Sequence, residues 1–451
     1  MSKPDPSNTT RPVPGGTAFR GIWYCCGTAN ALPGRKYVYG GGKATYSAWH
    51  RPMAVYARQV DKTFFVFGNP SNAPTISTYD PKTGTFAKPV VIGQNMDKNA
   101  HRNPTILIDE VGSAASQAGT IYVFRGYNGM PTYVSRSDRP YDITRWTDRT
   151  PVETGKKASY PQPWQLRAGE IFVSYRQRPG WSFRISKDGA ASWEPTVNLV
   201  KFGDAQIYAV TVAETGAFPR KIHIVWSRLG GGTPEEIRTK HLWARRYNVY
   251  YACSDDGGRT WRRSDGKVLP LPITEATAEK VYDCGQHGVW LKDIQLDSKG
   301  DLYVLFIDAD VATFRSAWKV ARHSGGRWTI TDVTTSDHMY DGGALAILSD
   351  DDVRIYGPTT ASQPQVDGGE IEEWRSVDGG RTWQNTAHLT TGSQYSHNHV
   401  KTVLHHERAR GDFRIFWSYG DASYPPASKD VHLYFYGERM AGPKRIVCGR
   451  P

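Results

Sequence analysis

The sequence predicts an all-β fold, a seven-bladed β-propeller with hairpin turn motifs, closed by N- and C-terminal strands. Three observations predict it: a turn motif recurs three times, short alternating runs lie between the copies, and no long apolar-periodic helical segment is present. The motif reads Ser-x-Asp-x-Gly-x-Thr/Ser-Trp. Its copies are SKDGAASW (186–193), SDDGGRTW (254–261) and SVDGGRTW (376–383). Recurrence of such a unit at long intervals is typical of a repeat fold.

The residue types of this motif fit a β-hairpin turn. The aspartates Asp188, Asp256 and Asp378 are expected to accept hydrogen bonds from turn amides. Glycine permits a positive φ, and tryptophan closes the hairpin; the first copy has Ala190 in place of the glycine. These roles are structural, so the motif predicts architecture and leaves the chemistry open.

Weaker copies of the hairpin fill the intervals between the three clear ones. They are STYDPKTGTF (77–86), SDRPYDITRW (137–146) and HSGGRW (323–328). Alternating runs that predict strands are KTFFVFG (62–68), TIYVFRG (120–126), EIFVSYR (170–176), KIHIVWS (221–227), DLYVLFID (301–308) and DFRIFWSYG (412–420). Six hairpin units and a closing blade, shared between residues 21–24 and VHLYFYG (431–437), give seven blades.

Composition predicts one domain. Residues 1–16 are polar and predict a disordered N-terminal segment, whereas 17–451 predict a single propeller. The 45 Gly, 28 Pro, 15 Trp and 25 Tyr suit many short strands and turns. No apolar run approaches the length of a membrane span, so we expect no membrane partner. We also expect a monomer.

Charge indicates an acidic partner. The formal net charge is +12, but no nucleic-acid recognition motif accompanies it, so we expect an acidic oligo- or polysaccharide and no nucleic acid. The five cysteines do not form a secreted disulfide framework, and the N-terminus has no apolar signal segment. Two interpretations stay open: a secreted or periplasmic protein whose leader is absent from this chain, or a cytoplasmic protein.

Several segments resemble a particular group of propeller enzymes. The three motif copies are similar to the Asp boxes of sialidase-like propellers. FRGIWY (19–24), KATYSAWHRPMAVY (43–56), KTFFVFG and AHRNPTILID (100–109) resemble the ulvan lyases of polysaccharide lyase families 24 and 25. They also resemble the L-rhamnose-α-1,4-D-glucuronate lyases of family 42 and the gum-arabic rhamnosidases of glycoside hydrolase family 145. The resemblance covers nearly the whole chain. It implies a seven-bladed propeller acting on a uronate-containing glycan of the gum arabic, arabinogalactan or ulvan type.

The resemblance to the lyases implies a catalytic set at one tunnel mouth. The His of the His-x-Asn-Pro motif matches His101, and the tyrosine matches Tyr160. The second histidine of the lyases falls at Tyr127 or Asn128, a departure from their pattern. For β-elimination at the rhamnose–glucuronate linkage, His101, Tyr127 and Tyr160 would be the acid–base set.

Substrate-binding residues follow from the need to neutralise the uronate carboxylate. The arginine of the lyases matches Arg176, and Arg220 is a second candidate for the carboxylate clamp. Tyr175 and Trp164 are expected to contact the glycan.

Two other functions stay open. Hydrolysis of the same linkage, as an α-L-rhamnosidase, would use His50 at the opposite mouth, as the resemblance to family 145 implies. A non-catalytic glycan-binding propeller would share the arginine and aromatic contacts. Sialidase activity is not favoured, because FRGIW (19–23) lacks the proline of the sialidase motif.

The chemistry is expected to need no cofactor. Cys284, His287, His397 and His399 are zinc-ligand types and predict a structural metal ion, Ca or Zn, near the propeller axis.

Overall fold

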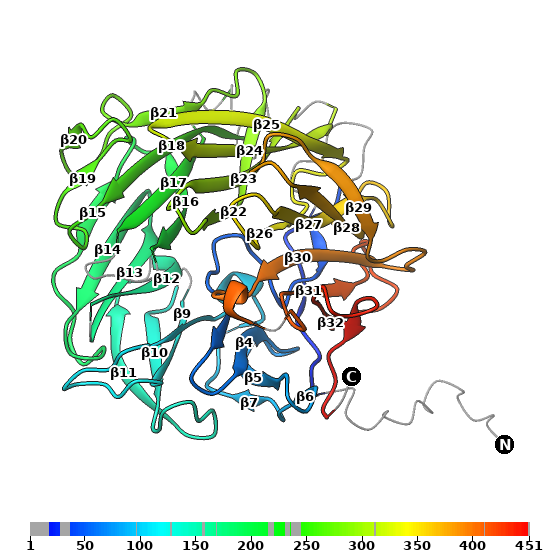
Figure 1. Cartoon of the computed structure of the whole chain (residues 1–451), viewed down its shortest axis with the longest axis horizontal. Coiled ribbons are helices and arrows are strands. Elements are labelled where there is room, and N and C mark those ends of the chain that lie inside the picture. Colours follow the sequence, from blue (N-terminus) through cyan, green and yellow to red (C-terminus); the bar gives the residue numbers. More distant parts are fainter. Residues whose placement is uncertain are drawn as a thin grey trace.

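Seven antiparallel sheets surround a central axis in the computed structural model (Figure 1). The structure describes residues 18–27, 37–95, 97–126, 129–155, 158–167, 169–214, 221–230, 235, 245–310, 313–409 and 411–449. The predicted seven-bladed propeller is confirmed. Within these residues no helix is long and apolar enough to cross a membrane. The predicted disordered segment, 1–16, lies outside the described residues.

The innermost strand of each blade contacts the innermost strands of neighbouring blades and lines the axis. These strands are β3 (Ala54–Ala57), β8 (Thr105–Ile108), β12 (Ala158–Arg167), β16 (Gln206–Ala213), β22 (Gly288–Leu296), β26 (Ala344–Ile347) and β30 (Ser396–Thr402).

The second strands include the predicted alternating runs, which are therefore confirmed as strands. They are β4 (Lys62–Gly68), β9 (Ile121–Arg125), β13 (Glu170–Gln177), β17 (Ile222–Leu229), β23 (Leu302–Ala309), β27 (Val353–Thr360) and β31 (Ile415–Gly420). They are buried on both faces between adjacent blades; Phe64 to Phe67 of β4, for example, are fully buried.

The third strands are β5 (Pro74–Asp80), β10 (Thr132–Ser137), β14 (Gly180–Ser186), β18 (Arg246–Ser254), β24 (Ser316–Ser324), β28 (Glu370–Ser376) and β32 (His432–Tyr436). The outer strands are β6 (Thr85–Phe86), β7 (Val90–Val91), β11 (Trp146–Glu153), β15 (Val197–Val200), β19 (Trp261–Arg262), β20 (Val268–Leu269), β21 (Glu279–Tyr282), β25 (Arg327–Ser336), β29 (Gln384–His388) and β33 (Lys444–Arg445). All six predicted hairpins connect a third strand to an outer strand.

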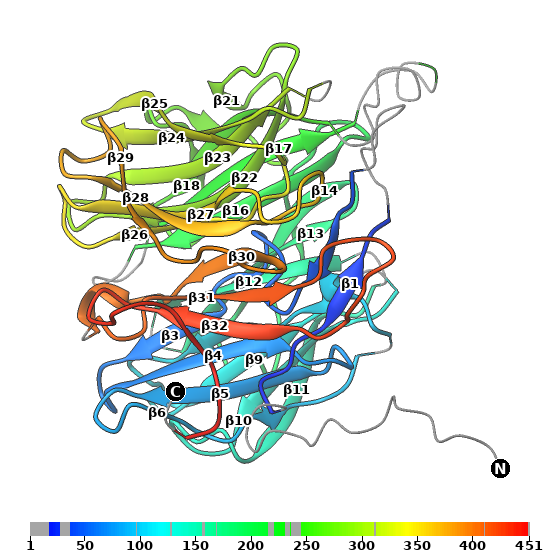
Figure 2. The ribbon, with the colours of Figure 1, turned by 90° about the vertical axis from the view of Figure 1, so that its right-hand side faces the viewer.

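Three short elements lie outside the blades. The hairpin of β1 (Trp23–Cys25) and β2 (Gly40–Gly42) lies at one end of the ring, as the side view shows (Figure 2). The 3₁₀ helix η1 (Ala100–Arg102) precedes β8, and η2 (His406–Arg408) follows β30.

Ring closure differs in one detail from the prediction. Both termini cross the seam, but the seventh blade is built from β30–β33 alone and shares no strand with residues 21–24. The N-terminal segment adds one bridge, Arg20 to His432, and the C-terminal segment adds one, Gly449 to Phe86 of β6. The sequence of β30, SHNHVKT, begins with polar residues although the strand is buried, so its pattern did not predict a strand.

The motif turns have the predicted hydrogen bonds. In the third copy, Asp378 accepts from the backbone N–H groups of Arg381 (2.9 Å) and Thr382 (3.0 Å) and from the Ser376 hydroxyl (2.7 Å). Burial acts to raise the pKa of Asp378, but these hydrogen bonds outweigh it and lower the pKa to about 2. In the first copy Ala190 adopts φ 63°, the left-handed conformation that glycine favours.

The motif tryptophans are not equivalent. Trp261 donates to the Gly258 carbonyl of its own turn (3.1 Å), as predicted. Trp193 and Trp383 instead donate to Thr150 and Thr331 (2.9 and 3.2 Å), which lie on the outer strands of the preceding blades. Two of the three motifs therefore connect adjacent blades.

Replacing Asp378 with alanine is expected to lower the free energy of unfolding by about 1–2 kcal/mol, because several turn donors lose their acceptor. Chemical denaturation of the variant measures this loss. Asp351→Ala is a matched control, because this exposed residue accepts from the Gly379 N–H through its backbone carbonyl, which the variant keeps. Equal stability of the two variants would contradict the structural role of Asp378.

Candidate functional site

The innermost strands begin at one mouth of the tunnel, here called the entry mouth, and end at the exit mouth. Three aromatic rings at or just before strand starts lie close together: His101 and Tyr160 have ring centroids 6.2 Å apart, and Tyr160 and Tyr208 6.4 Å apart. Residues at strand ends, such as Gln295 and Val403, line a common cavity at the exit mouth. The starts of three innermost strands, β8, β12 and β16, therefore meet at one site although they belong to different blades.

His101 lies in η1, at the entry mouth. Its ring Nδ1 is 2.7 Å from the Asn99 side-chain oxygen, and its Nε2 is 3.2 Å from the Tyr46 hydroxyl. Burial lowers the pKa of His101 well below its ordinary value, and the positive charge of Arg176 acts in the same direction. The imidazole is therefore neutral at neutral pH and suited to accept a proton.

Arg176 lies between two tyrosine rings. Its guanidinium carbon is 4.6 Å from the ring centroid of Tyr160 and 4.8 Å from that of Tyr208. Tyr160 adopts φ 60°, and the register of β12 shifts between Ser159 and Gln162, where Pro161 also lies. Proline tolerates such a bulge, and bulges re-aim side chains. The structure therefore places His101, Tyr160 and Arg176 close together, as predicted.

Sequence analysis missed Tyr208 and Arg246. The Arg246 guanidinium carbon is 4.5 Å from the Tyr208 ring centroid. Burial acts to raise the pKa of Tyr208, but Arg176 and Arg246 outweigh it and lower this pKa below its ordinary value. Tyr208, like Tyr160, is the third residue of the innermost strand of its blade. Its position near a strand start could therefore have indicated a site residue in the sequence.

His50 lies at the entry mouth beside His101, so its predicted place at the opposite mouth is wrong. Its Nε2 is 3.0 Å from the His101 carbonyl oxygen, and its Nδ1 accepts from the Ser47 N–H at 2.8 Å. Burial lowers the pKa of His50 to about 3, and Lys401 acts in the same direction. Since both ring nitrogens have backbone partners, the geometry favours a structural role for His50.

Two predicted substrate contacts are wrong. Tyr175 points to the face of β13 opposite Arg176, because neighbouring strand residues alternate, and its hydroxyl is 3.3 Å from Glu153. Trp164 lies deep in the tunnel wall and donates to Thr211 at 2.8 Å. Both side chains are buried in the core. Tyr127, Asn128 and Arg220 lie outside the described residues.

The four predicted metal ligands do not converge, so this site is wrong. Cys284 contacts the His287 carbonyl (3.2 Å), and the His287 ring pairs with Asp308 (2.6 Å). His397 accepts from Trp417 (2.9 Å), and His399 lies 3.0 Å from Lys43. Among the described residues no group of three or more His, Cys, Asp or Glu is placed to hold a metal ion. The two pairs lie in different blades, at β22 and β30, and the fold does not bring them together.

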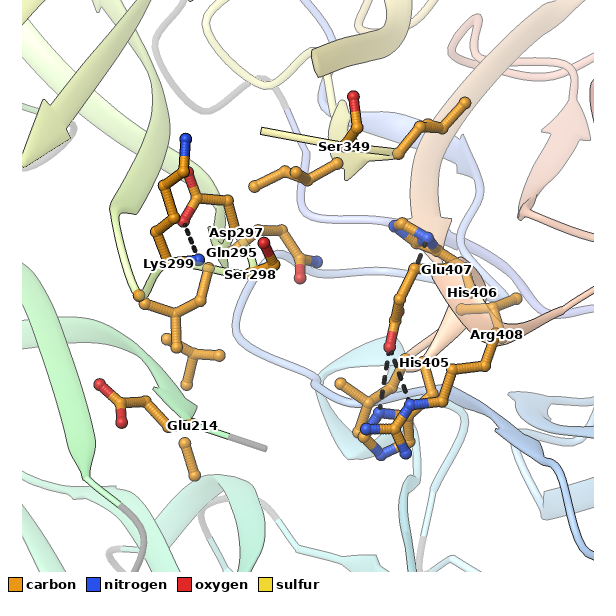
Figure 3. A pocket seen from close by; sticks show the side chains of 18 residues that line it. Glu214, Gln295, Asp297, Ser298, Lys299, Ser349, His405, His406, Glu407 and Arg408 are labelled. Carbon is orange, nitrogen blue, oxygen red and sulfur yellow. Dashed lines mark hydrogen bonds and ion pairs between the residues drawn. The ribbon is translucent and has the colours of Figure 1, made fainter. Parts of the chain in front are cut away.

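A cavity with a volume of about 510 Å³ lies at the exit mouth (Figure 3). Both of its labelled cations have acidic partners: Arg408 lies 3.2 Å from Glu407, and Lys299 lies 3.0 Å from Asp350, which is outside the cavity lining. Burial and Arg414 also lower the pKa of His406 at the exit mouth. At the entry mouth burial lowers the pKa of His101, and two arginines stacked on one tyrosine ring, Arg176 and Arg246, lower the pKa of Tyr208. Perturbed groups of this kind mark functional sites, so we assign the candidate site to the entry mouth.

The entry-mouth side chains provide three chemical capabilities. Arg176 and Arg246 can bind an anionic group. The neutral His101 can accept a proton at Nε2, and the hydroxyls of Tyr160 and Tyr208 can donate or accept one. His101 and Tyr340 are partly exposed, whereas Tyr160, Arg176 and Tyr208 are buried behind them. A ligand would therefore approach past His101.

The protein is therefore a seven-bladed β-propeller that carries a buried cluster of arginine and tyrosine side chains at one mouth of its tunnel. Residues 44–336 match the model of the BNR repeat-containing family, and the chain belongs to this family. A search of curated proteins finds no match.

Two kinds of solved structure share the fold across the chain. A PL25 ulvan lyase, solved alone and bound to -[GlcA(1-4)Rha3S]-, is 18% identical, with a TM-score of 0.73 over 94% of this chain and 96% of the lyase. The polysaccharide lyase Uly1 is 14% identical, with a TM-score of 0.62 over 94% of this chain and 98% of that protein. At these identities the likeness establishes the fold.

Buried neutral histidines are expected to make stability pH-dependent. Burial lowers the pKa of His50, His338 and His397 to about 3 each. Below about pH 6.5 the unfolded chain binds protons at these residues and the folded chain does not. The free energy of unfolding therefore decreases as the pH is lowered. The raised pKa values of buried Asp341 and Asp367 act in the opposite direction and partly offset this loss.

We expect the thermal midpoint to fall by about 5 °C or more between pH 7 and pH 4.5. Calorimetry across this range measures it. A midpoint that stays constant or rises on acidification would contradict the account of neutral buried histidines.

Proposed function

We propose that this protein is a polysaccharide lyase that cleaves a glycan at glucuronate by β-elimination, at an L-rhamnose-α-1,4-D-glucuronate linkage. The observation that carries the proposal is the position of Arg176, between Tyr160 and Tyr208 and close to His101. The solved lyases that share the fold add support, since one of them was bound to a glucuronate–rhamnose unit. The net charge of +12 suits an acidic glycan.

Elimination requires three events that this cluster can perform. Arg176, with Arg246 beside it, neutralises the C6 carboxylate, so that the proton at C5 becomes acidic enough to remove. His101 Nε2 or the Tyr208 phenolate accepts this proton. The C5 electron pair then forms the C4–C5 double bond as the C4–O4 bond breaks, and the Tyr160 hydroxyl protonates the leaving O4. Every electron pair is accounted for without an oxidant or a reductant.

A substrate panel tests the proposal. The protein is incubated with rhamnose–glucuronate oligosaccharides, with ulvan, with gum arabic, and with oligosaccharides whose carboxyl groups have been reduced to alcohols. We expect products lighter by one water than hydrolysis products, as measured by mass spectrometry, and none from the reduced substrates. Rhamnose release with hydrolytic masses would support the hydrolase instead, and binding without any product would support a glycan-binding propeller.

We expect the elimination to need no dissociable cofactor, because Arg176 supplies the positive charge that a metal ion provides elsewhere. Dialysis against EDTA should leave kcat within about twofold of the untreated protein. Activity that is lost on dialysis and restored by Ca²⁺ or Zn²⁺ would contradict this prediction. We further propose that the protein acts as a secreted or periplasmic monomer.

A further inference from the structure

Asn99 makes two contacts with the same histidine. It is the N-cap of η1, and its side-chain oxygen accepts from the His101 backbone N–H at 3.1 Å and lies 2.7 Å from the His101 ring Nδ1. A backbone N–H can only donate, so the atom facing it must be the amide oxygen rather than the amide nitrogen. The orientation of the Asn99 amide is therefore fixed by the backbone.

This orientation determines the tautomer of His101. Because the Asn99 oxygen only accepts, Nδ1 must carry the ring proton. Nε2 of the neutral ring then has the lone pair, and it is this atom that lies 3.2 Å from the Tyr46 hydroxyl. Since the lone pair accepts, Tyr46 is the donor in this contact.

We propose that Asn99 is a positioning residue that holds His101 as the Nδ1–H tautomer, so that Nε2 is the proton-accepting atom at the entry mouth. This inference rests on the proposed function for its catalytic consequence, but the tautomer itself is independent of any activity. In the opposite tautomer Nε2 would carry a proton and could not act as a base.

The surrounding loop holds both partners of the imidazole in place. The Asn103 side chain donates to the carbonyls of Lys43 and Tyr46, each at 2.7 Å, and so ties the loop after η1 to the Tyr46 segment. Asn95 donates to the Arg102 carbonyl at 3.3 Å and so anchors the same loop through the backbone of the residue after His101. Asn95→Ala is therefore a matched control for Asn99→Ala.

The first test measures the tautomer directly. ¹⁵N NMR of the histidine-labelled full chain distinguishes a protonated from an unprotonated ring nitrogen, and the His101 signals are assigned by their loss in His101→Gln. We expect Nδ1–H in the wild type and in Asn95→Ala, and a mixture of tautomers in Asn99→Ala. A wild-type ring protonated at Nε2, or an unchanged ring in Asn99→Ala, would overturn the inference.

The second test measures the catalytic consequence. Asn99→Ala should lower kcat by about tenfold or more with little change in KM, whereas Asn95→Ala should not. Asn99→Asp keeps the acceptor and adds a negative charge beside an imidazole whose pKa is lowered by burial and then by Arg176, His50, Arg178 and Arg246. It should restore the tautomer and move the acidic limb of the kcat/KM profile to higher pH.

The two tests separate failure of the inference from failure of the proposed function. The predicted tautomer without elimination activity in the wild type would refute the proposed function and leave the inference intact. Elimination activity with equal kcat in Asn99→Ala and the wild type would refute the positioning role. Denaturation curves of each variant show whether the lost N-cap has also destabilised the fold.

Discussion

Replacing Arg176 with alanine is expected to lower kcat/KM for elimination by roughly 10²–10³-fold, the typical effect of removing a group that stabilises developing charge. Arg176 is fully buried against Tyr160 and Tyr208, where the low dielectric strengthens its attraction for a carboxylate. Steady-state kinetics on a rhamnose–glucuronate oligosaccharide measures the loss. Arg176→Lys keeps the charge but not the planar fork, so an intermediate rate is expected.

Two controls accompany this prediction. Lys299→Ala removes an exposed cation at the exit mouth and should leave the rate unchanged, because the chemistry is assigned to the entry mouth. A denaturation curve shows whether Arg176→Ala still folds. Full activity of a folded Arg176→Ala variant, or a large loss in Lys299→Ala, would contradict the assignment of the site.

Removing the hydroxyl of Tyr160 is expected to lower kcat by roughly 10²–10⁴-fold, the usual contribution of a general acid or base. In Tyr160→Phe the ring that stacks on Arg176 is kept, so KM should change little. Tyr175→Phe is the matched control from the adjacent strand, since its hydroxyl faces Glu153 and not the tunnel. Equal activity of Tyr160→Phe and the wild type would show that another group protonates the leaving oxygen.

Tyr208→Phe separates the two candidate bases. The arginines lower the pKa of Tyr208, and a phenolate base is active only when deprotonated, so kcat/KM should rise with pH up to that pKa. If Tyr208 is the base, its replacement removes this rise and lowers the rate at every pH. If Tyr208→Phe keeps the activity of the wild type, His101 is the proton acceptor, because its lowered pKa leaves the imidazole neutral across this pH range.

The architecture could be predicted from the sequence because its determinants are local. An Asp–Gly turn followed by tryptophan requires particular residues at fixed offsets, and the second strands of the blades are short alternating runs. The seventh blade was harder to predict, because the buried polar residues His397 to His399 of β30 interrupt the apolar alternation. Closure through the single bridges at Arg20 and Gly449 has no local sequence signal.

The candidate site was predictable only in part. His101, Tyr160 and Arg176 could be placed together by resemblance, and the structure brings them into contact distance. Arg246 could not, because it lies on the third strand of the blade whose innermost strand carries Tyr208, and no sequence motif links these two positions.

The errors have the same origin. Residues adjacent in sequence, such as Tyr175 and Arg176, lie on opposite faces of a strand. His50 was predicted at the opposite mouth of the tunnel, but the tertiary fold places its ring beside the His101 carbonyl.

The most direct measurement of the central claim is the ultraviolet absorbance of a rhamnose–glucuronate oligosaccharide during incubation with the protein, with free rhamnose measured in parallel. Elimination creates a C4–C5 double bond conjugated to the uronate carboxylate, which absorbs where the substrate does not. We predict that absorbance rises in step with cleavage for the wild type and Lys299→Ala and is nearly abolished in Arg176→Ala. Rhamnose release without a rise in absorbance would contradict the lyase assignment.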